Sequence, residues 1–535
     1  MKKPIPPLDL LFYLMETHDN PKHVAGLQVF EKPADAGEDY MLDLVDRLRK
    51  VPAAEPFNFK PVFPRAGLPR WQSVDDMEME YHLRHSALPA PGNMKQLMEV
   101  IQRLHAGILD RERPGWICQV IEGLEGNRFA VYCKIHHAYI DGMSGVRRMY
   151  GSLSTDPKSR ELVTLWGDQP SFAERGRKTA SKSPASRLRG AGRAAVTQAR
   201  AMTQVNAQLA KVALELARLH RHTGRIPFRA PRTRINDPVE SDLRSMGVTS
   251  MPLDQLKQIG KLAGCTVNDV VLTITDAALH DYLAKHGDDP GQPLVAMCPM
   301  SLRDADDDSA NTQVATLLVE LGQPGANLRE RLQQVAKSAS GSKADAKKMS
   351  KEGLIDFVLL MGGAFELLQR TGLDRFVPQS YNVLVSNVPG PGTEDMYMRG
   401  SRLVASYPIS TLTPGNNLNV TVLSHGNHLD FGLLAARGTL PDIDYLVERM
   451  DQRFQALARE FGVAIEGRGR RPAKKRPAGR KAAGRRSRSP AKKTTPRATA
   501  KPKPKAKAKP KAKPKAKAKA KTSGVSTRKS RKKSS

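Results

Sequence analysis

The sequence predicts an α/β fold of two layered lobes that are joined by a helical linker and followed by a basic C-terminal tail. Strand-like and helix-like apolar patterns alternate on both sides of the linker, which is typical of layered α/β lobes. The 535 residues are enough for two or more domains. No stretch approaches the roughly 18 consecutive apolar residues that a membrane-spanning helix requires, so we expect no such helix.

The individual elements follow from local patterns. Residues 129–135 have apolar side chains at every odd position, which predicts a strand. Pro252 and Gly264 bracket one helical pattern, and Asn268 or Asp269 could begin a longer, mostly buried helix over 267–283. Further strands are predicted at 294–297, 314–321, 381–388, 418–424 and 429–435, the last two as a hairpin around Gly426-Asn427, and a terminal helix at 441–461.

The formal net charge of +32 is unevenly distributed. Residues 467–535 contain 30 Lys or Arg and no acidic residue, and residues 174–234 contain 15 basic and two acidic residues. The rest of the chain has a net charge of −11. We therefore divide the chain into an N-terminal lobe (1–173), a basic helical linker (174–234), a C-terminal lobe (235–466) and a tail (467–535).

The tail is built mainly from Lys, Ala, Pro, Arg and Ser, and it has too few large apolar residues to offset the entropy of ordering. We expect it to be disordered and to bind a polyanion such as DNA, polyphosphate or anionic lipid. The alternative is a solvated tail that only increases solubility. No aromatic residue follows Phe461, so the tail offers no side chain on which nucleic-acid bases could stack.

The linker contains one apolar stripe at helical spacing. Such a stripe predicts a helix that packs against the lobes or lies on a membrane or lipid-inclusion surface. Both interpretations stay open, and the stripe consists of Met202, Val205, Leu209, Val212, Leu216 and Leu219.

Residues 136–142 read His-His-Ala-Tyr-Ile-Asp-Gly and directly follow the strand predicted at 129–135. A histidine at a strand end can act as a general base, because its pKa lies near neutrality. Asp141 can orient the loop or an imidazole, and Gly142 permits a tight turn or close approach of a ligand. The structural alternative is a pair of histidines that only stabilise a turn.

Other chemistries are poorly supported. Adjacent histidines point in different directions and no third ligand has suitable spacing, so we expect no metal. No GxSxG motif occurs, which argues against a serine hydrolase. The four cysteines form no CxxC pair and fit a reducing cytoplasm: Cys118, Cys133, Cys265 and Cys298. The N-terminus lacks an apolar signal core, so we expect that the protein is not secreted.

The HHxxxDG pattern is the signature of the coenzyme-A-dependent acyltransferase superfamily, which includes chloramphenicol acetyltransferase and peptide-synthetase condensation domains. More closely, the chain resembles the bacterial bifunctional wax ester synthase/diacylglycerol acyltransferase family over nearly all of residues 1–460. The other segments that carry the resemblance are Pro7-Leu8-Asp9, Glu16-Thr17, Pro21–Leu27, Leu109–Trp116, Asn268–Val271, Pro299–Arg303 and Ser386–Pro391.

The resemblance implies two chloramphenicol-acetyltransferase-like lobes with a tunnel between them. It implies that His137 takes the proton from a diacylglycerol or fatty-alcohol hydroxyl, whose oxygen attacks acyl-CoA directly without a cofactor. Asp141 would be structural, with Arg303 as the candidate for its ion-pair partner. Further site residues are His136 and Gly142, and Asn268 and Asp269 would cap the following helix or shape the site.

Two residues depart from the family pattern. Gly115 replaces the usual Leu, which we expect to loosen packing near the histidines, and Lys22 stands where Met is common and could alter the acyl or alcohol pocket. Because both expected substrates are lipids, we expect a cytoplasmic enzyme that associates peripherally with the inner membrane or lipid inclusions.

Two rival hypotheses remain. A condensation-type acyltransferase would predict neighbouring carrier or adenylation modules. A non-enzymatic nucleoid- or lipid-inclusion-binding protein would predict a broken motif, whereas both histidines, Asp141 and Gly142 are intact.

Overall fold

The computed structural model describes residues 1–169, 230–239, 241–301, 314–347, 379–392, 394–413 and 415–465. The apolar stripe predicted at 202–219, the tail at 467–535 and Arg303 lie outside the described residues. The described residues all belong to one compact unit.

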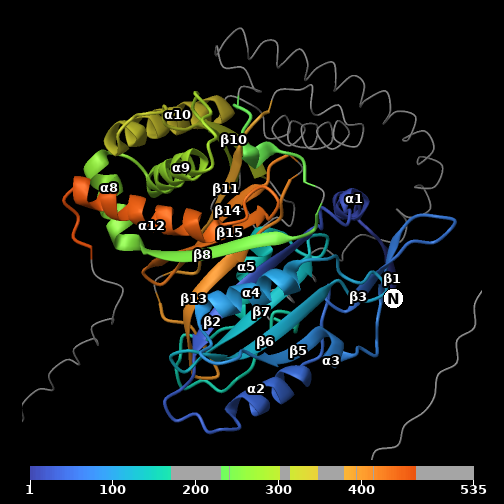
Figure 1. Cartoon of the computed structure of the whole chain (residues 1–535). Coiled ribbons are helices and arrows are strands. Elements are labelled where there is room, and N and C mark those ends of the chain that lie inside the picture. The colour runs from blue at the N-terminus through green and yellow to red at the C-terminus, as the bar shows by residue number, and fades with distance from the viewer. Residues whose placement is uncertain are drawn as a thin grey trace, which may run out of the picture. The chain divides into compact units, whose positions relative to one another are not determined.

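The first large sheet has six strands in the order β12-β13-β2-β7-β6-β5 (Figure 1). The pairings β12–β13, β13–β2, β2–β7 and β7–β6 are antiparallel, and β5 pairs parallel with β6. The strand predicted at 129–135 is confirmed as β7. The bounds are β2 (His23–Glu31), β5 (Leu83–Ala87), β6 (Trp116–Leu124), β7 (Arg128–His136), β12 (Tyr397–Met398) and β13 (Ser401–Ile409).

Strand β7 is buried on both faces, because the odd and even side chains enter different apolar clusters. Phe129 and Val131 pack with α2 (Tyr40–Arg49) and with α5 (Gly142–Gly151). Ala130 and Tyr132 pack with α4 (Met94–His105), which begins with a capping box between Asn93 and Gln96.

A small sheet leads into the first helix. Its order is β1-β4-β3, and both pairings are antiparallel. Its strands are β1 (Lys2–Pro4), β3 (Phe59–Val62) and β4 (Arg70–Ser73), and the chain continues from β1 into α1 (Pro7–Met15). The short helix α3 (Met79–His82) precedes β5.

The second large sheet has the order β10-β9-β11-β14-β15-β8, and its four helices share one apolar core with it (Figure 1). All the strands predicted in this lobe are confirmed, as is the hairpin, in which His425 pairs with His428. The strands are β8 (Arg244–Pro252), β9 (Val295–Ser301), β10 (Val314–Glu320), β11 (Val383–Val388), β14 (Leu418–His425) and β15 (His428–Ala436), and the helices are α8 (Leu253–Ala263), α9 (Val267–Lys285), α10 (Leu328–Lys347) and α12 (Ile443–Glu460).

The end of α8 and the start of α9 are set by helix-capping residues. Gly264 ends α8 at φ 68°, a left-handed conformation that glycine adopts without strain, as the sequence predicts. The prediction that Asn268 or Asp269 begins α9 is wrong by two or three residues, because Thr266 is the N-cap residue. Thr266 accepts from the Asp269 backbone at 3.3 Å, and Asp269 accepts in return from the Thr266 backbone at 2.8 Å.

The lobe boundary drawn from the sequence does not separate the two sheets. Residues 397–409, which fall in the predicted C-terminal lobe, form β12 and β13, and β13 pairs with β2 in the first sheet. Helix α4 of the first lobe also contacts the second sheet, where Gln102 donates to the carbonyl of Met246 on β8 at 3.4 Å. The lobes therefore share a strand and an apolar cluster.

Within the described ranges, no single helix has the length and apolar character needed to cross a membrane. Helices α8 and α9 meet the length and composition test only as a pair bent by 98°. Helix α9 is a core helix of the second lobe, with most of its residues buried.

Candidate functional site

The His-His-Ala-Tyr-Ile-Asp-Gly segment, residues 136–142, lies at the end of β7 and the start of α5. His136 is the last residue of β7, and its backbone N–H donates to the Gly115 carbonyl at 2.8 Å. The next backbone N–H, that of His137, donates to the Lys22 carbonyl at 2.8 Å. The residues directly before β6 and β2 therefore hold the backbone of the two histidines.

His136 is enclosed. Its side chain is 2% exposed, and its ring stacks on Tyr13 of α1 with the centroids 4.0 Å apart. Its Nδ1 accepts from the Ala138 backbone at 3.2 Å, which leaves the proton on Nε2. Nε2 lies 3.5 Å from Oε1 of Glu16. Burial lowers the pKa of His136, and the nearby Glu16 carboxylate partly opposes this shift.

Glu16 connects His136 to two further groups. Its Oε1 accepts from the Lys22 backbone at 3.2 Å, and its Oε2 accepts from Nη2 of Arg111 at 3.0 Å. Burial would raise the pKa of Glu16, but the contacts with His136, Lys22 and Arg111 outweigh it and lower the pKa. Glu16 is therefore a buried carboxylate that fixes His136 and the chain before β2.

His137 is less enclosed than His136. Its ring stacks on Phe12 of α1, with centroids 4.2 Å apart and planes 15° from parallel. Its Nδ1 is buried and has no hydrogen-bond partner in another described residue. Removal from water lowers the pKa of His137 to about 4, although a hydrogen bond with its own backbone and the nearby Asp141 act in the opposite direction.

Asp141 and Gly142 begin helix α5. The Asp141 carboxylate accepts from the Ser144 backbone at 2.7 Å and is thus the N-cap of the helix. Gly142 does not have a positive φ, so the turn does not require glycine. A Cβ atom at Gly142 would meet nothing within 4 Å, which leaves open space beside the start of α5.

Asp9, in the first turn of α1, is a further carboxylate in this region. Burial raises its pKa to about 6, with Lys3 lowering it and the neighbouring Asp141 raising it. Asp9 and Asp141 therefore bring two carboxyl groups near each other at the start of α1 and α5.

Asn268 and Asp269 lie in the first turn of α9. Asp269 is buried and forms the capping box described above, and its second oxygen, Oδ1, is buried without a hydrogen-bond partner among the described residues. The observed contacts are those of helix capping. Arg303, the expected partner of Asp141, belongs to residues 302–313, which the structure does not describe.

The two residues that depart from the family pattern both contact the histidine segment. A Cβ atom at Gly115 would lie 2.7 Å from Cε2 of Tyr139 and 3.2 Å from Cβ of His136. The expectation of loosened packing is therefore wrong, because the Tyr139 ring occupies the space beside Gly115. Lys22 is 4% exposed, and its charge is among the influences that lower the pKa of His137.

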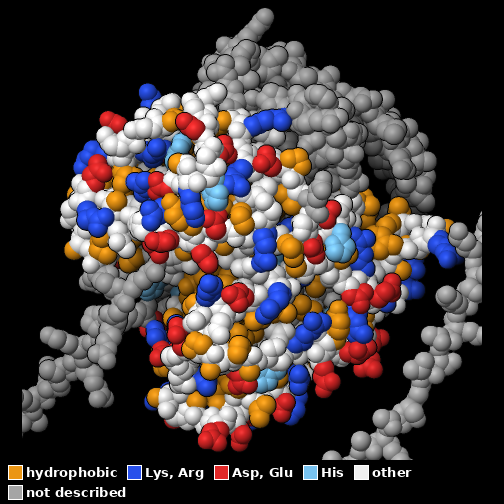
Figure 2. All heavy atoms as spheres, in the orientation of Figure 1, with side chains coloured by type: hydrophobic (Ala, Val, Ile, Leu, Met, Phe, Trp, Pro, Cys, Tyr) orange, Lys and Arg blue, Asp and Glu red, His pale blue; other side chains and the backbone are white. Residues whose placement is uncertain are grey.

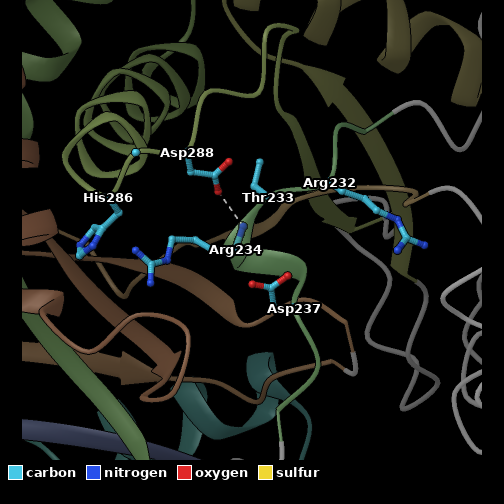
Figure 3. Close-up of a pocket in the computed structure, with 7 residues that line it drawn as sticks. Arg232, Thr233, Arg234, Asp237, His286 and Asp288 are labelled. Atoms are coloured by element: carbon cyan, nitrogen blue, oxygen red, sulfur yellow. Dashed lines mark hydrogen bonds between the residues drawn. The ribbon is translucent and has the colours of Figure 1, made fainter.

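A separate cavity of about 410 Å³ opens beside the C-terminal end of α9 (Figure 3). The Arg234 side chain points toward His286, whereas Arg232 points away from it (Figure 3). Asp288 accepts from the Arg234 backbone at 2.8 Å. Two guanidinium groups and the carboxylates of Asp237 and Asp288 give the cavity mixed charge. It shares no residue with the histidine segment.

No sequence pattern indicates a role for Phe12, Tyr13 or Arg111. These residues come from α1 and from the loop before β6, far along the chain from the histidines. Arg111 also donates to the Tyr13 carbonyl at 3.1 Å, so it fixes α1 as well as Glu16. The family resemblance includes Pro7–Asp9, Glu16 and Leu109–Trp116, which lie near or include these residues. It did not indicate which side chains they contact.

Comparison with known proteins gives consistent matches. Residues 5–271 match the family model of the wax ester synthase/diacylglycerol acyltransferase catalytic domain, and residues 311–458 match that of the WS/DGAT C-terminal domain. A putative diacylglycerol O-acyltransferase of Mycobacterium bovis, Mb3115, is 35% identical over 463 residues, which cover 86% of this chain and 97% of the relative. The probable diacylglycerol O-acyltransferase Tgs4 of Mycobacterium tuberculosis matches to the same extent.

Two solved structures also match this chain. The wax ester synthase/diacylglycerol acyltransferase from Marinobacter aquaeolei VT8 is 29% identical with a TM-score of 0.67, over 86% of this chain and all of that one. The first condensation domain of the CDA synthetase is 16% identical with a TM-score of 0.50, over 86% and 95% of the two chains, and shows a likeness of fold alone.

Proposed function

Because the chain belongs to the wax ester synthase/diacylglycerol acyltransferase family, we propose that it transfers a fatty acyl group from acyl-CoA to diacylglycerol, with His137 as the general base. The single observation that carries this assignment is the position of His137. It directly follows β7, its ring stacks on Phe12, and its Nδ1 is buried.

His137 is neutral at pH 7, because its pKa lies at about 4. A neutral Nε2 can take the proton from the acceptor hydroxyl while the hydroxyl oxygen attacks the thioester carbonyl carbon. The C–O bond forms, the C–S bond breaks, and the coenzyme A thiolate receives the proton from the imidazolium. A thioester is already activated, so the protein needs mainly to orient the two substrates.

The groups around His137 position its imidazole. The Lys22 carbonyl fixes its backbone, Phe12 fixes its ring, and His136 is held by Glu16 and Tyr13. Asp141 starts α5 directly after the histidines. We assign these groups the role of holding the imidazole in one orientation, because small displacements of a general base reduce its effect strongly.

Diacylglycerol is the proposed acceptor because the 35% identical mycobacterial relatives are named for it. A long-chain alcohol is a second acceptor, supported by the name of the Marinobacter enzyme. We further propose that the enzyme associates peripherally with a membrane or lipid inclusion, since both substrates are lipids, and that the 30 positive charges of residues 467–535 bind a polyanion.

The test is an esterification assay of the purified full chain with palmitoyl-CoA and either diacylglycerol or hexadecanol. His137→Ala is expected to lower the rate about 10²–10⁴-fold with either acceptor, which is the usual contribution of general-base catalysis. His18→Ala is the matched control, because the side chain of His18 is 75% exposed. Full activity of His137→Ala would rule out the proposed mechanism.

A further inference from the structure

Large exposed apolar side chains gather on α1 and on the tip of the hairpin that joins β3 to β4. Leu14 is 59% exposed and Leu68 is 82% exposed, and Leu11 and Phe63 are also exposed. Figure 2 shows hydrophobic side chains together over this region, at the right-hand side of the view. We call these four residues the α1–hairpin face. Leu11 and Leu14 are three positions apart on α1 and so lie on one side of the helix.

The two parts of this face are held together. The Tyr13 ring of α1 packs edge-on against Phe63, with centroids 5.5 Å apart. The guanidinium of Arg111 lies over both rings, at 5.5 Å from Tyr13 and 5.6 Å from Phe63. The backbone of Ile5, just before α1, donates to the Pro69 carbonyl next to Leu68 at 3.5 Å. Helix and hairpin thus form one platform.

The opposite side of α1 contacts the active site. Phe12 stacks on His137 and Tyr13 stacks on His136. One nine-residue helix therefore presents leucines to the outside and aromatic rings to the two histidines. A lipid surface against the outer side would lie directly beside the base that activates the lipid hydroxyl.

The charge of the hairpin suits an interface with lipid headgroups. Residues 57–74 contain Lys60, Arg65 and Arg70 but no acidic residue, although Lys60 pairs with Glu112 at 3.4 Å. Arg65 lies between Phe63 and Leu68 in the loop itself and is exposed. Apolar side chains flanked by cations are typical of surfaces that insert into the boundary between headgroups and acyl chains.

We propose that the α1–hairpin face is the surface by which the enzyme docks on a diacylglycerol-containing lipid surface. The inference rests on the proposed acyl transfer to a lipid acceptor and adds the location of the docking surface. It differs from the linker stripe, because all four residues belong to the N-terminal lobe. Docking at this face delivers the acceptor hydroxyl beside His137 without passage through bulk water.

The test measures binding of the full chain to vesicles of phosphatidylcholine and diacylglycerol in about 1 M salt. At this concentration the Debye length is about 3 Å, so binding through the basic linker and tail is suppressed and apolar docking persists. Leu14→Glu/Leu68→Glu is expected to weaken binding at least about tenfold, since burial of each leucine is lost. Acyl-CoA is omitted, so the result does not depend on turnover.

The matched control is Leu42→Glu/Leu262→Glu. Both leucines are 57% exposed but lie on α2 and α8, away from the α1–hairpin face. The control is expected to bind like the unchanged chain, and melting temperatures of both variants should match it. Equal binding by the Leu14→Glu/Leu68→Glu variant, equal weakening of the control, or no binding by the unchanged chain would each overturn the proposal. Loss of esterification in His137→Ala would leave the binding result unaffected.

Discussion

At the scale of single residues, the most informative quantity is the pKa of His137. Removal of its ring from water lowers the pKa to about 4, and the charge of Lys22 acts in the same direction. Asp141 acts in the opposite direction. A general base works only in its neutral form, so this environment keeps His137 ready to accept a proton over the whole physiological range.

The dependence of kcat/KM on pH tests this environment. Protonation of His137 removes the base, so activity is expected to fall as pH falls through about 4 to 5, well below the value of 6.5 for an exposed histidine. Lys22→Met removes a neighbouring cation and should move this fall to higher pH. Asp141→Asn keeps a residue that can cap α5 but removes the anion, so it should move the fall to lower pH.

Each sample is returned to pH 7 after a brief exposure, and full recovery of activity shows that the acid did not unfold the protein. A fall centred at 6.5 in the unchanged enzyme would contradict the buried environment of His137. Shifts of both variants in the same direction would show that these charges do not act on the ring as described.

At the scale of elements, a glycine stands at the start of β6 and another at the start of α5, but only the first position excludes a side chain. Gly115 has no room for a side chain, because Tyr139 and His136 would lie 2.7 and 3.2 Å from its Cβ. Gly142 has open space around it. The sequence predicted a role for each residue but could not reveal the space around them, because that space depends on side chains of other elements.

One substitution at each glycine tests whether the space around it is filled or open. Gly115→Leu, which restores the usual residue of the family, is expected to lower the free energy of unfolding by about 1–3 kcal/mol, the typical cost of overpacking. Gly142→Ala is expected to change stability little or to raise it by up to about 1 kcal/mol, because alanine favours a helix over glycine. Urea denaturation at pH 7 measures both values. An equally stable Gly115→Leu protein would mean that Tyr139 readily moves aside.

The elements also show what could be predicted from sequence. Helix α8 was predicted correctly because Pro252 and Gly264 are local signals at its ends. The start of α9 was misplaced because Asn268, Asp269 and Thr266 are all good capping residues, and only the side-chain contacts select Thr266. The stacking of Phe12 and Tyr13 on the histidines could not be predicted, because it joins residues far apart in the sequence and local patterns do not indicate such contacts.

At the scale of the whole molecule, the two lobes are joined by more than the linker. Strand β13 crosses to the first sheet, and its Ser406 backbone donates to the buried carboxylate of Asp430 on β15 at 2.7 Å. Asp430 also accepts from the Ser250 hydroxyl of β8 at 2.6 Å. Alternation of strands and helices predicted the fold class, but strand exchange between lobes depends on pairing partners that the sequence does not identify.

The buried titratable groups of the two lobes make the stability of the folded protein depend on pH. Burial is the leading cause of a lowered pKa at six described histidines: His23, His82, His105, His136, His137 and His280. Between pH 6.5 and about 4, these groups bind protons when unfolded but resist them when folded, so their contribution to stability is lost as pH falls. Asp9 and Asp276, with pKa values raised to about 6, and Asp430, raised to about 7, act oppositely.

The histidines outnumber the opposing carboxyl groups, so the melting temperature is expected to fall from pH 7 to pH 5. Each uncompensated site contributes at most about 1.4 kcal/mol per pH unit. His280→Asn removes one contributing group and should make the fall shallower. Asp430→Asn removes one opposing group and should make it steeper, whatever its effect at pH 7. Calorimetry at pH 7, 6 and 5 compares the slopes, and a melting temperature that rises toward pH 5 would show that the carboxyl groups dominate.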